Sequence, residues 1–393
     1  NLLDLDETLL HRTHYANCIV MPALAMAEMT GASGQDLIAA VALGFDVAAR
    51  VGLSMPQYES TSEGVVYFVP VWGFSWAVFG TAVAAGWLLG LNHQQMANAL
   101  GIAYVSTPVH FSGKTSGPRQ QSAGRGRLMH KRAMYGAIAA AGINAALLAA
   151  RGFTGDPAVL DSDRAFWTAF GVSPANWDFM VRDLGRRWFI EETSIKFYPA
   201  GRQASIPVDL FLKIIREEGL SGDEIDEVIV TVPPAHIAMG LYDNVTPPSQ
   251  VGPMAIPFVL AIAASGLESG LKWISHETLE NPWIRGFARK VRSEVNQDWY
   301  SIIVDQVRAE GVYRRIPTSI EIKARGTSFN AFAEYARGDP WGPEPMTDEE
   351  LAHKFRNYTS DLIGSDNADR AVIEAYNLDA ASDVQGLISA LHT

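Results

Sequence analysis

Acidic and histidine side chains gather at the start of the chain, within LLDLDETLLHRTH. The acids are Asp4, Asp6 and Glu7, and the histidines are His11 and His14. Side chains of these two kinds can donate and accept protons, so the group can perform general acid–base catalysis or bind a metal ion. An acidic helix start with ordinary surface histidines is the alternative, and composition by itself favours it.

A second candidate is the cationic, glycine-containing stretch at residues 112–132, SGKTSGPRQQSAGRGRLMHKR. Glycines let a backbone approach an anion, and arginine pairs with carboxylate or phosphate through two hydrogen bonds. The stretch lacks the GxxxxGK[ST] pattern of nucleotide-binding loops. It predicts either an anion site or a solvated loop. Its cations are Lys114, Arg119, Arg125, Arg127, Lys131 and Arg132.

A third candidate is Lys196, which stands before an aromatic–proline turn in SIKFYPAGRQASIP and is followed by Arg202. A lysine at such a turn can bind a substrate carboxylate or stabilise an enolate. The alternative is a lysine at a domain junction that keeps its ammonium group in water. The chain contains no GxSxG, HExxH or GxGxxG motif.

The composition of the 393 residues excludes several classes of protein. Hydrophobic residues make up 48% of the chain, which is typical of a globular protein with a large core. A formal net charge of −12 argues against general nucleic-acid binding. The single cysteine, Cys18, excludes an internal disulfide framework, a cysteine-based zinc site and a cysteine-ligated iron–sulfur cluster. One cysteine also fits a reducing, cytoplasm-like compartment.

The first half of the chain predicts helices. Residues 22–51 predict two helices separated at the glycines of GASGQD, and residues 73–91 and 94–105 predict another pair. Residues 133–151 form a long, nearly uncharged run of small residues. A membrane span is conceivable there, but the run is weakly hydrophobic, and we expect a soluble-core helix buried on all sides.

The pattern changes after about residue 195. Residues 227–232 and 319–324 are rich in β-branched side chains and predict strands. Residues 207–218, 258–265 and 281–292 predict helices between them. Thr347 and Glu350 form a capping box that starts a further helix. The chain is therefore expected to be mainly α with an inserted α+β lid domain. The predicted parts are a helical domain at 1–194, the lid at 195–344 and a return to the helical domain at 345–393.

Five segments in this order resemble the MmgE/PrpD family. They are LLDLDETLLHRTHYANCIVMPALAMAE, LMHKRAMYGAIAAAGINAALLAARGFTG, SIKFYPAG, PMAIPFVLAIAASG and PEPMTDEELAHKF. The family includes 2-methylcitrate dehydratase, cis-aconitate decarboxylase and iminodisuccinate epimerase. The resemblance covers essentially the whole chain and implies the same two-domain architecture, a homodimer and a site between helical domain and lid. It implies no metal and no organic cofactor. Family members carry further helices before the first segment, so we expect residues upstream of Asn1.

The resemblance also implies roles for single residues. Asp4, Thr8 and His14 fall on the functional positions of the first segment, and Lys131 and Lys196 fall on the lysines of the second and third. The two lysines would neutralise substrate carboxylates and stabilise the charge left by proton loss. His14 would be the general acid or base, Asp4 would orient it or act as a base, and Thr8 would hydrogen-bond a carboxylate.

Three departures mark a divergent member. Val71 or a neighbour stands where the family has histidine, Gly201 stands where it has cysteine or histidine, and Phe258 replaces a tyrosine. These losses argue against 2-methylcitrate and cis-aconitate as substrates. The polar residues near these segments that can substitute as substrate-binding groups are His110, Tyr67 and Arg202.

The expected activity is that of a cofactor-independent lyase of the dehydratase type. It would remove the proton next to a carboxylate of a small carboxylic acid and eliminate water. The alternatives are an epimerase or isomerase, a decarboxylase using the same proton abstraction, and a non-catalytic ligand-binding member. We expect a cytoplasmic protein that binds neither nucleic acid nor membranes.

Overall fold

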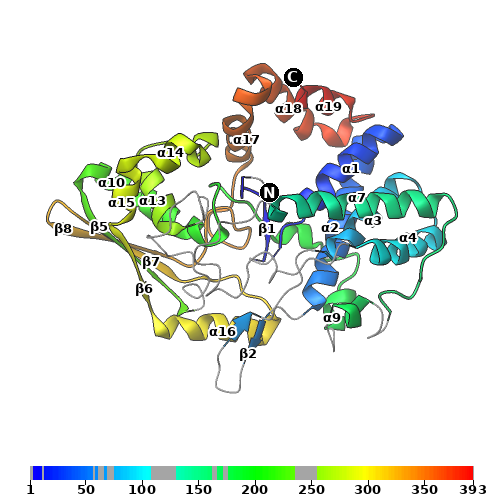
Figure 1. Ribbon diagram of the computed structural model, residues 1–393, viewed down its shortest axis with the longest axis horizontal. Helices are drawn as coiled ribbons and strands as arrows, with labels where there is room; N and C mark the ends of the chain where they lie inside the picture. The colour runs from blue at the N-terminus through cyan, green and yellow to red at the C-terminus, as the bar shows by residue number, and fades with distance from the viewer. Residues whose placement is uncertain are drawn as a thin grey trace.

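The computed structural model describes residues 3–10, 13–55, 58–60, 66–68, 75–107, 130–161, 166–170, 176–234 and 255–392, with the backbone alone at 58–60, 66–68 and 130–133. Figure 1 shows helices α1–α4 and α7 on one side and a sheet with its covering helices on the other. The first strand, β1 (Thr8–Leu9), lies near the centre, and the C-terminal helices stand above it. The chain is thus mainly α with a mixed α+β part, as the sequence predicts.

The helical part is built from α1 (Ala16–Thr30), α2 (Gly34–Ser54), α3 (Ala77–Leu88), α4 (His93–Ser106) and α7 (His130–Ala150). Both predicted helix pairs are confirmed. The break between the first two helices has the expected cause, because the chain ends α1 with a left-handed Gly31 and starts α2 with a capping box. The short helices α8 (Phe166–Ala169) and α9 (Trp177–Val181) follow.

Helices α2 and α3 cross at two glycines. A Cβ on Gly44 would lie 2.6 Å from the Gly80 carbonyl oxygen, and a Cβ on Gly80 would lie 2.3 Å from the Gly44 carbonyl oxygen. Neither position can hold a larger side chain without moving a backbone. Because residues 77–86 of α3 are all buried, this crossing fixes the centre of the helical core.

The expectation that the helix at 133–151 is buried on all sides is wrong for the single chain. Gly136, Ala137, Ala140 and Asn144 of α7 are exposed and share one face of the helix. Among the described residues α2 alone has the length and apolar character of a membrane span, but 67% of its most apolar window is buried inside the protein.

The lid is organised around a four-stranded sheet in the order β6–β5–β7–β8. Its strands are β5 (Ile225–Val232), β6 (Val291–Val295), β7 (Thr318–Ala324) and β8 (Thr327–Ala333). β5 runs parallel to β6 and antiparallel to β7, which forms a hairpin with β8. The two predicted strands correspond to β5 and β7, and alternate residues of β7 are buried, as its period of two requires.

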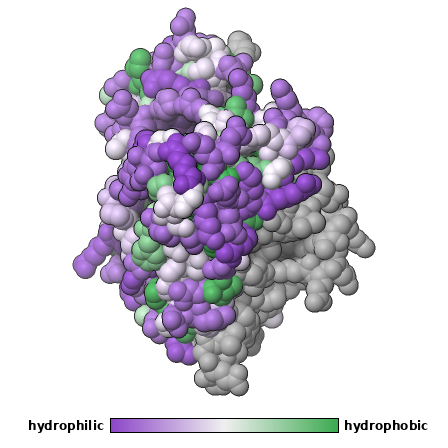
Figure 2. All heavy atoms as spheres, turned by 90° about the vertical axis from the view of Figure 1, so that its left-hand side faces the viewer, coloured by the Kyte–Doolittle hydropathy of each residue, from purple (hydrophilic) through white to green (hydrophobic). Residues whose placement is uncertain are grey.

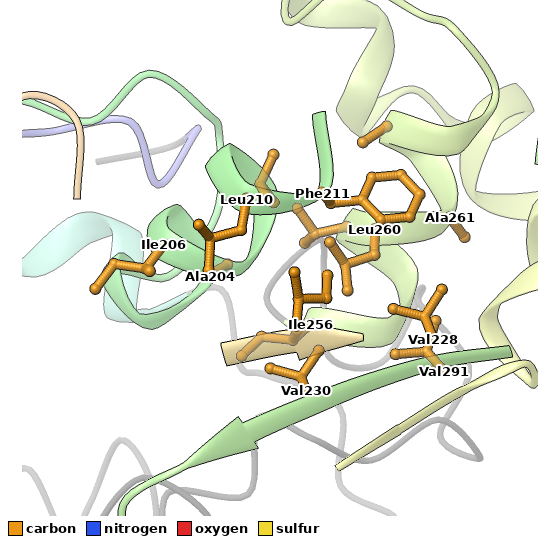
Figure 3. Packing of buried hydrophobic residues seen from close by; sticks show 14 of the residues in the cluster. Ala204, Ile206, Leu210, Phe211, Val228, Val230, Ile256, Leu260, Ala261 and Val291 are labelled. Carbon is orange, nitrogen blue, oxygen red and sulfur yellow. The ribbon is translucent and has the colours of Figure 1, made fainter. Parts of the chain in front are cut away.

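Two helices cover this sheet, α10 (Ser205–Glu218) and α13 (Ile256–Ala264). Figure 3 shows side chains of both, among them Phe211 and Leu260, packed with Val228 and Val291 of the neighbouring strands. The outer face of the lid is mostly hydrophilic, and its apolar residues are scattered (Figure 2). The other lid helices are α14 (His276–Glu280), α15 (Pro282–Ala288) and α16 (Tyr300–Glu310).

The predicted helix at residues 281–292 is too long. Helix α15 ends at Ala288, and Arg292 lies in β6, where Val291 is paired with Val228 of β5. The local pattern is helical, but pairing with a strand distant in sequence decides the conformation of the last residues.

The chain ends with α17 (Asp348–Ile363), α18 (Ser365–Tyr376) and α19 (Gln385–Leu391). The predicted capping box is confirmed, because Thr347 Oγ1 accepts from the Glu350 amide at 3.3 Å and the Glu350 carboxylate accepts from the Thr347 amide at 2.9 Å. Val384, just before α19, is buried in the hydrophobic core of the first helices. The C-terminal segment thus packs against the N-terminal helices, while the boundaries at 194 and 344 stay predictions.

Candidate active site

A pair of two-residue strands brings the first and third candidate segments together. β1 (Thr8–Leu9) is antiparallel to β4 (Thr193–Ser194), with Thr8 opposite Ser194. Since the two strands run in opposite directions, the residues before Thr8 lie beside the residues after Ser194. The acidic segment and Lys196 therefore meet at the centre of the molecule, where Figure 1 places β1.

Lys196 is held within this pairing. Its side chain is only 1% exposed, and its Nζ donates to the backbone carbonyl oxygen of Asp4 at 2.9 Å. Asp4 is itself buried and has φ +54°, a backbone conformation that residues other than glycine adopt rarely. Such strain persists only where the surroundings impose it, and it is concentrated at functional sites.

The segment that carries Lys196 is also fixed from the lid side. The Ile195 amide donates to the Gly338 carbonyl oxygen at 3.0 Å. Gly338 has φ +88°, and a Cβ there would lie 2.3 Å from the Ile195 carbonyl oxygen, so only glycine fits. Lys196 is thus positioned between the N-terminal segment and a loop of the lid.

His14 is oriented by two neighbours. Its Nδ1 contacts the backbone carbonyl oxygen of Glu7 and lies 3.6 Å from Asp6 Oδ2. A carbonyl oxygen can only accept, so Nδ1 carries the proton and Nε2 is the basic nitrogen of the neutral ring. When the ring gains a second proton, the Asp6 carboxylate stabilises the resulting charge. His14 is 19% exposed, which leaves it within reach of a small molecule.

Glu7 caps helix α1. Its Oε1 accepts from the backbone amides of Tyr15 and Ala16, while Tyr15, at the cap position, makes no side-chain capping bond. Burial raises the pKa of Glu7 above its usual value, although the nearby His14 ring and the two amide donors oppose the rise. The cap connects the position of His14 to the start of α1.

Hydroxyl groups complete the surroundings. Thr8 Oγ1 and Ser194 Oγ are buried and have no hydrogen-bond partner among the described residues. Tyr135 of α7 is also buried, and burial followed by the charge of Asp6 raises its pKa well above the usual value. Tyr135 therefore stays protonated and can act as a donor. Together these groups place a histidine, a buried ammonium group and several hydroxyls in one region of the protein.

Comparison with known proteins identifies the family of the chain. Residues 1–178 match the MmgE/PrpD N-terminal domain, and residues 198–380 match the MmgE/PrpD C-terminal domain. The chain belongs to the MmgE/PrpD family. Among the curated relatives of this family member is cis-aconitate decarboxylase of Aspergillus terreus, 25% identical over 99% of this chain and 78% of that protein. Cis-aconitate decarboxylase of Homo sapiens is 24% identical over 99% of this chain and 76% of that protein.

The structure brings four of the predicted site residues of this MmgE/PrpD protein together: Asp4, Thr8, His14 and Lys196. Lys131 lies in the first turn of α7, one turn before Tyr135, and its side chain is outside the described part. The side chain of Tyr67, in β3 (Val66–Phe68) of the hairpin with β2 (Tyr58–Ser60), is outside it as well. His110 and Val71 fall wholly outside the described residues.

Arg202 is engaged with another residue of the lid. Its guanidinium group is buried and forms an ion pair with Asp339, which is fully buried and also accepts from the Ala336 amide at 2.9 Å. This pairing gives Arg202 a structural role, and its predicted role in substrate binding stays a prediction. Phe258, the replacement for the family tyrosine, is buried in the hydrophobic core of the lid.

Three residues of the site are additions to the predicted set. Asp6 lies beside His14, Glu7 holds the ring through its carbonyl group, and Tyr135 is a buried hydroxyl whose pKa is raised by burial and then by the charge of Asp6. Asp6 and Glu7 are in the acidic segment singled out from the sequence, but spacing alone does not show which acid contacts the histidine. Among the described residues no three His, Cys, Asp or Glu side chains converge as a metal site requires.

Proposed function

We propose that this MmgE/PrpD protein is a lyase that removes the proton next to a carboxylate of a small carboxylic acid and then eliminates water. The observation that supports it best is that the β1–β4 pair places Lys196 against the acidic segment whose Asp6 and Glu7 hold His14. His14 Nε2 takes the proton, with Nδ1 held by the Glu7 carbonyl and the new charge stabilised by Asp6. The α-carbon electron pair moves into the carboxylate as an enolate, which the Lys196 ammonium group stabilises. The β-hydroxyl then leaves as water with the proton that His14 returns, which restores the neutral ring.

Decarboxylation is the second candidate. It is favoured by the curated relatives, which are named cis-aconitate decarboxylase and align with almost the whole chain. The same charge stabilisation by Lys196 would serve a carbanion formed by loss of carbon dioxide. Epimerisation uses the same proton abstraction with return of the proton from the other face, for which Tyr135 is a candidate donor. We further propose that the protein works without a cofactor, as a homodimer, in the cytoplasm.

Product analysis separates these outcomes. Purified protein is incubated with 2-methylcitrate, citrate, cis-aconitate and iminodisuccinate, and the mixture is followed by proton NMR and by released carbon dioxide. A new alkene signal without carbon dioxide supports the lyase of the dehydratase type. Carbon dioxide release supports the decarboxylase, and a changed stereocentre without either supports the epimerase. A folded protein that turns over none of these and binds none would contradict the proposal.

A further inference from the structure

A cavity of about 490 Å³ lies between the lid and helix α17. On the lid side it is lined by Phe197, which follows Lys196, and by Ser269 and Arg337. On the other side it is lined by residues of α17, among them Lys354 and Tyr358. The cavity therefore adjoins the segment that carries Lys196, and its far wall comes from the last part of the chain.

Most polar groups around this cavity form hydrogen bonds with one another. Ser269 Oγ donates to the Phe197 carbonyl oxygen and lies 2.9 Å from the Tyr358 hydroxyl. His353 and Asn357 both contact the Glu268 carboxylate, at 2.9 and 2.8 Å. These bonds join α17 to the lid and fix the shape of the cavity.

Arg337 is engaged as well. Its guanidinium group pairs with Glu350 and lies 4.4 Å from the centre of the Phe197 ring. Two contacts thus hold this cation against the cavity wall, and little of its charge remains available to a ligand.

Lys354 is the exception. It is partly buried, yet its ammonium group has no hydrogen bond and no ion pair with any residue in the described part of the chain. A lysine in this position loses hydration without gaining a partner, which costs free energy. Proteins tolerate such a cost chiefly where the group has a use.

The charges around Lys354 are those of the candidate active site. Burial and then the ammonium group of Lys196 lower the pKa of Lys354 to about 8, while Glu7 and Asp6 act in the opposite direction. Two ammonium groups close enough to repel each other form a site that an anion stabilises. Lys354 consequently links the cavity to the reacting groups.

We propose that Lys354 is a substrate-binding residue of this site and that the cavity between lid and α17 holds the carboxylate arm of the substrate farthest from the reacting carbon. This proposal rests on the proposed function. Lys196 then stabilises charge at the reacting end while Lys354 pairs with the distal carboxylate. The C-terminal helix α17 contributes directly to specificity.

Calorimetric titration with propane-1,2,3-tricarboxylate, which has no hydroxyl group to eliminate, tests the proposal on the full chain. Lys354→Met keeps the aliphatic stem and removes the charge, and we expect it to weaken binding about 10- to 100-fold. Lys354→Arg should restore part of the affinity. Lys213→Met on the exposed surface of α10 removes the same charge elsewhere and should bind like the wild type.

Kinetics with any substrate that the protein turns over distinguishes binding from chemistry. Loss of the Lys354 charge should raise KM and leave kcat within about threefold. Equal affinity of Lys354→Met and wild type for the tricarboxylate, or no binding by the wild type, would overturn the role of Lys354. Binding that depends on Lys354 without turnover of any compound would instead remove the proposed function and leave the binding site.

Discussion

At the scale of single residues, burial and neighbouring groups give each ionisable side chain of the site its own environment. His14 is given one tautomer by the Glu7 carbonyl and a stabilising carboxylate by Asp6. Lys196 is buried with a backbone acceptor, whereas Lys354 is partly buried with no hydrogen bond or ion pair to the described residues. The two lysines are therefore suited to different tasks: one is fixed beside the reacting groups, and the other is available to a ligand.

Asp6→Asn should slow catalysis and leave the fold intact. Asparagine keeps an oxygen that can accept from Asn17 Nδ2, which donates to Asp6 Oδ2 at 3.3 Å, but it cannot stabilise a protonated His14. We expect a rate on the order of 10² lower in the product assay. Asp226→Asn, at an exposed position of β5, is the matched control. An unchanged rate would show that Asp6 does not assist the histidine.

The lowered pKa of Lys354 predicts that the stability of the protein depends on pH. Between about pH 8 and pH 10.5 the unfolded chain holds the Lys354 proton and the folded chain does not, so wild-type stability should rise with pH relative to Lys354→Met. The gain should reach about 3 kcal/mol, since one pKa unit corresponds to about 1.4 kcal/mol. Urea unfolding of both proteins at pH 7, 8, 9 and 10 measures it. A constant difference across this range would contradict the burial of this charge.

At the scale of elements, short and unremarkable segments position the site. The β1–β4 pair has only two residues on each strand, yet it aligns Thr8 with Ser194 and so places Lys196 beside the acidic segment. The start of α1 is capped from a distance by Glu7, which ties the histidine to the helical core. The crossing of α2 and α3 then fixes the core against which α1 packs.

Loss of the Glu7 cap should destabilise α1. Glu7→Ala leaves the amides of Tyr15 and Ala16 without their acceptor, and the free energy of unfolding should fall by about 1 kcal/mol. Glu7→Gln retains an accepting oxygen and should lose less. Chemical denaturation followed by circular dichroism measures both variants. A Gln variant that is as unstable as the Ala variant would mean that the charge, and not the capping bond, is what matters.

The helix crossing predicts opposite effects for two similar substitutions. Gly80→Ala places a methyl group against the Gly44 carbonyl oxygen and should lower the free energy of unfolding by about 1–3 kcal/mol. A methyl group at Gly136, on the exposed face of α7, would meet no atom within 4 Å. Gly136→Ala should therefore raise the free energy of unfolding by at most about 1 kcal/mol through helix propensity. Thermal unfolding measures the melting temperatures of the two variants. Equal melting temperatures would show that the α2–α3 contact is looser than described.

At the scale of the whole molecule, local patterns predicted most helices and the α+β character of the lid. Glycine turns and capping boxes are local signals, so the α1–α2 break and the start of α17 were predictable. Strand β6 and the β1–β4 pair were missed, since pairing partners distant in sequence determine them. The family motifs indicate His14 and Lys196 but not the contact with Asp6. The place of Lys354 depends on the packing of α17 beside the lid, which local patterns do not determine.

The most direct test of the whole account is deuterium incorporation at the α-carbon. Every proposed outcome forms a carbanion there, by loss of a proton or of carbon dioxide, and a carbanion that is protonated in deuterated water gains deuterium. Wild type, His14→Gln and the exposed-surface control His276→Gln are incubated in deuterated water with the panel of di- and tricarboxylates and followed by proton NMR. We predict deuterium incorporation by the wild type and the control, and a rate 10² to 10⁴ lower for His14→Gln. Exchange at the same rate in all three proteins would contradict the assignment of His14 as the acid–base group.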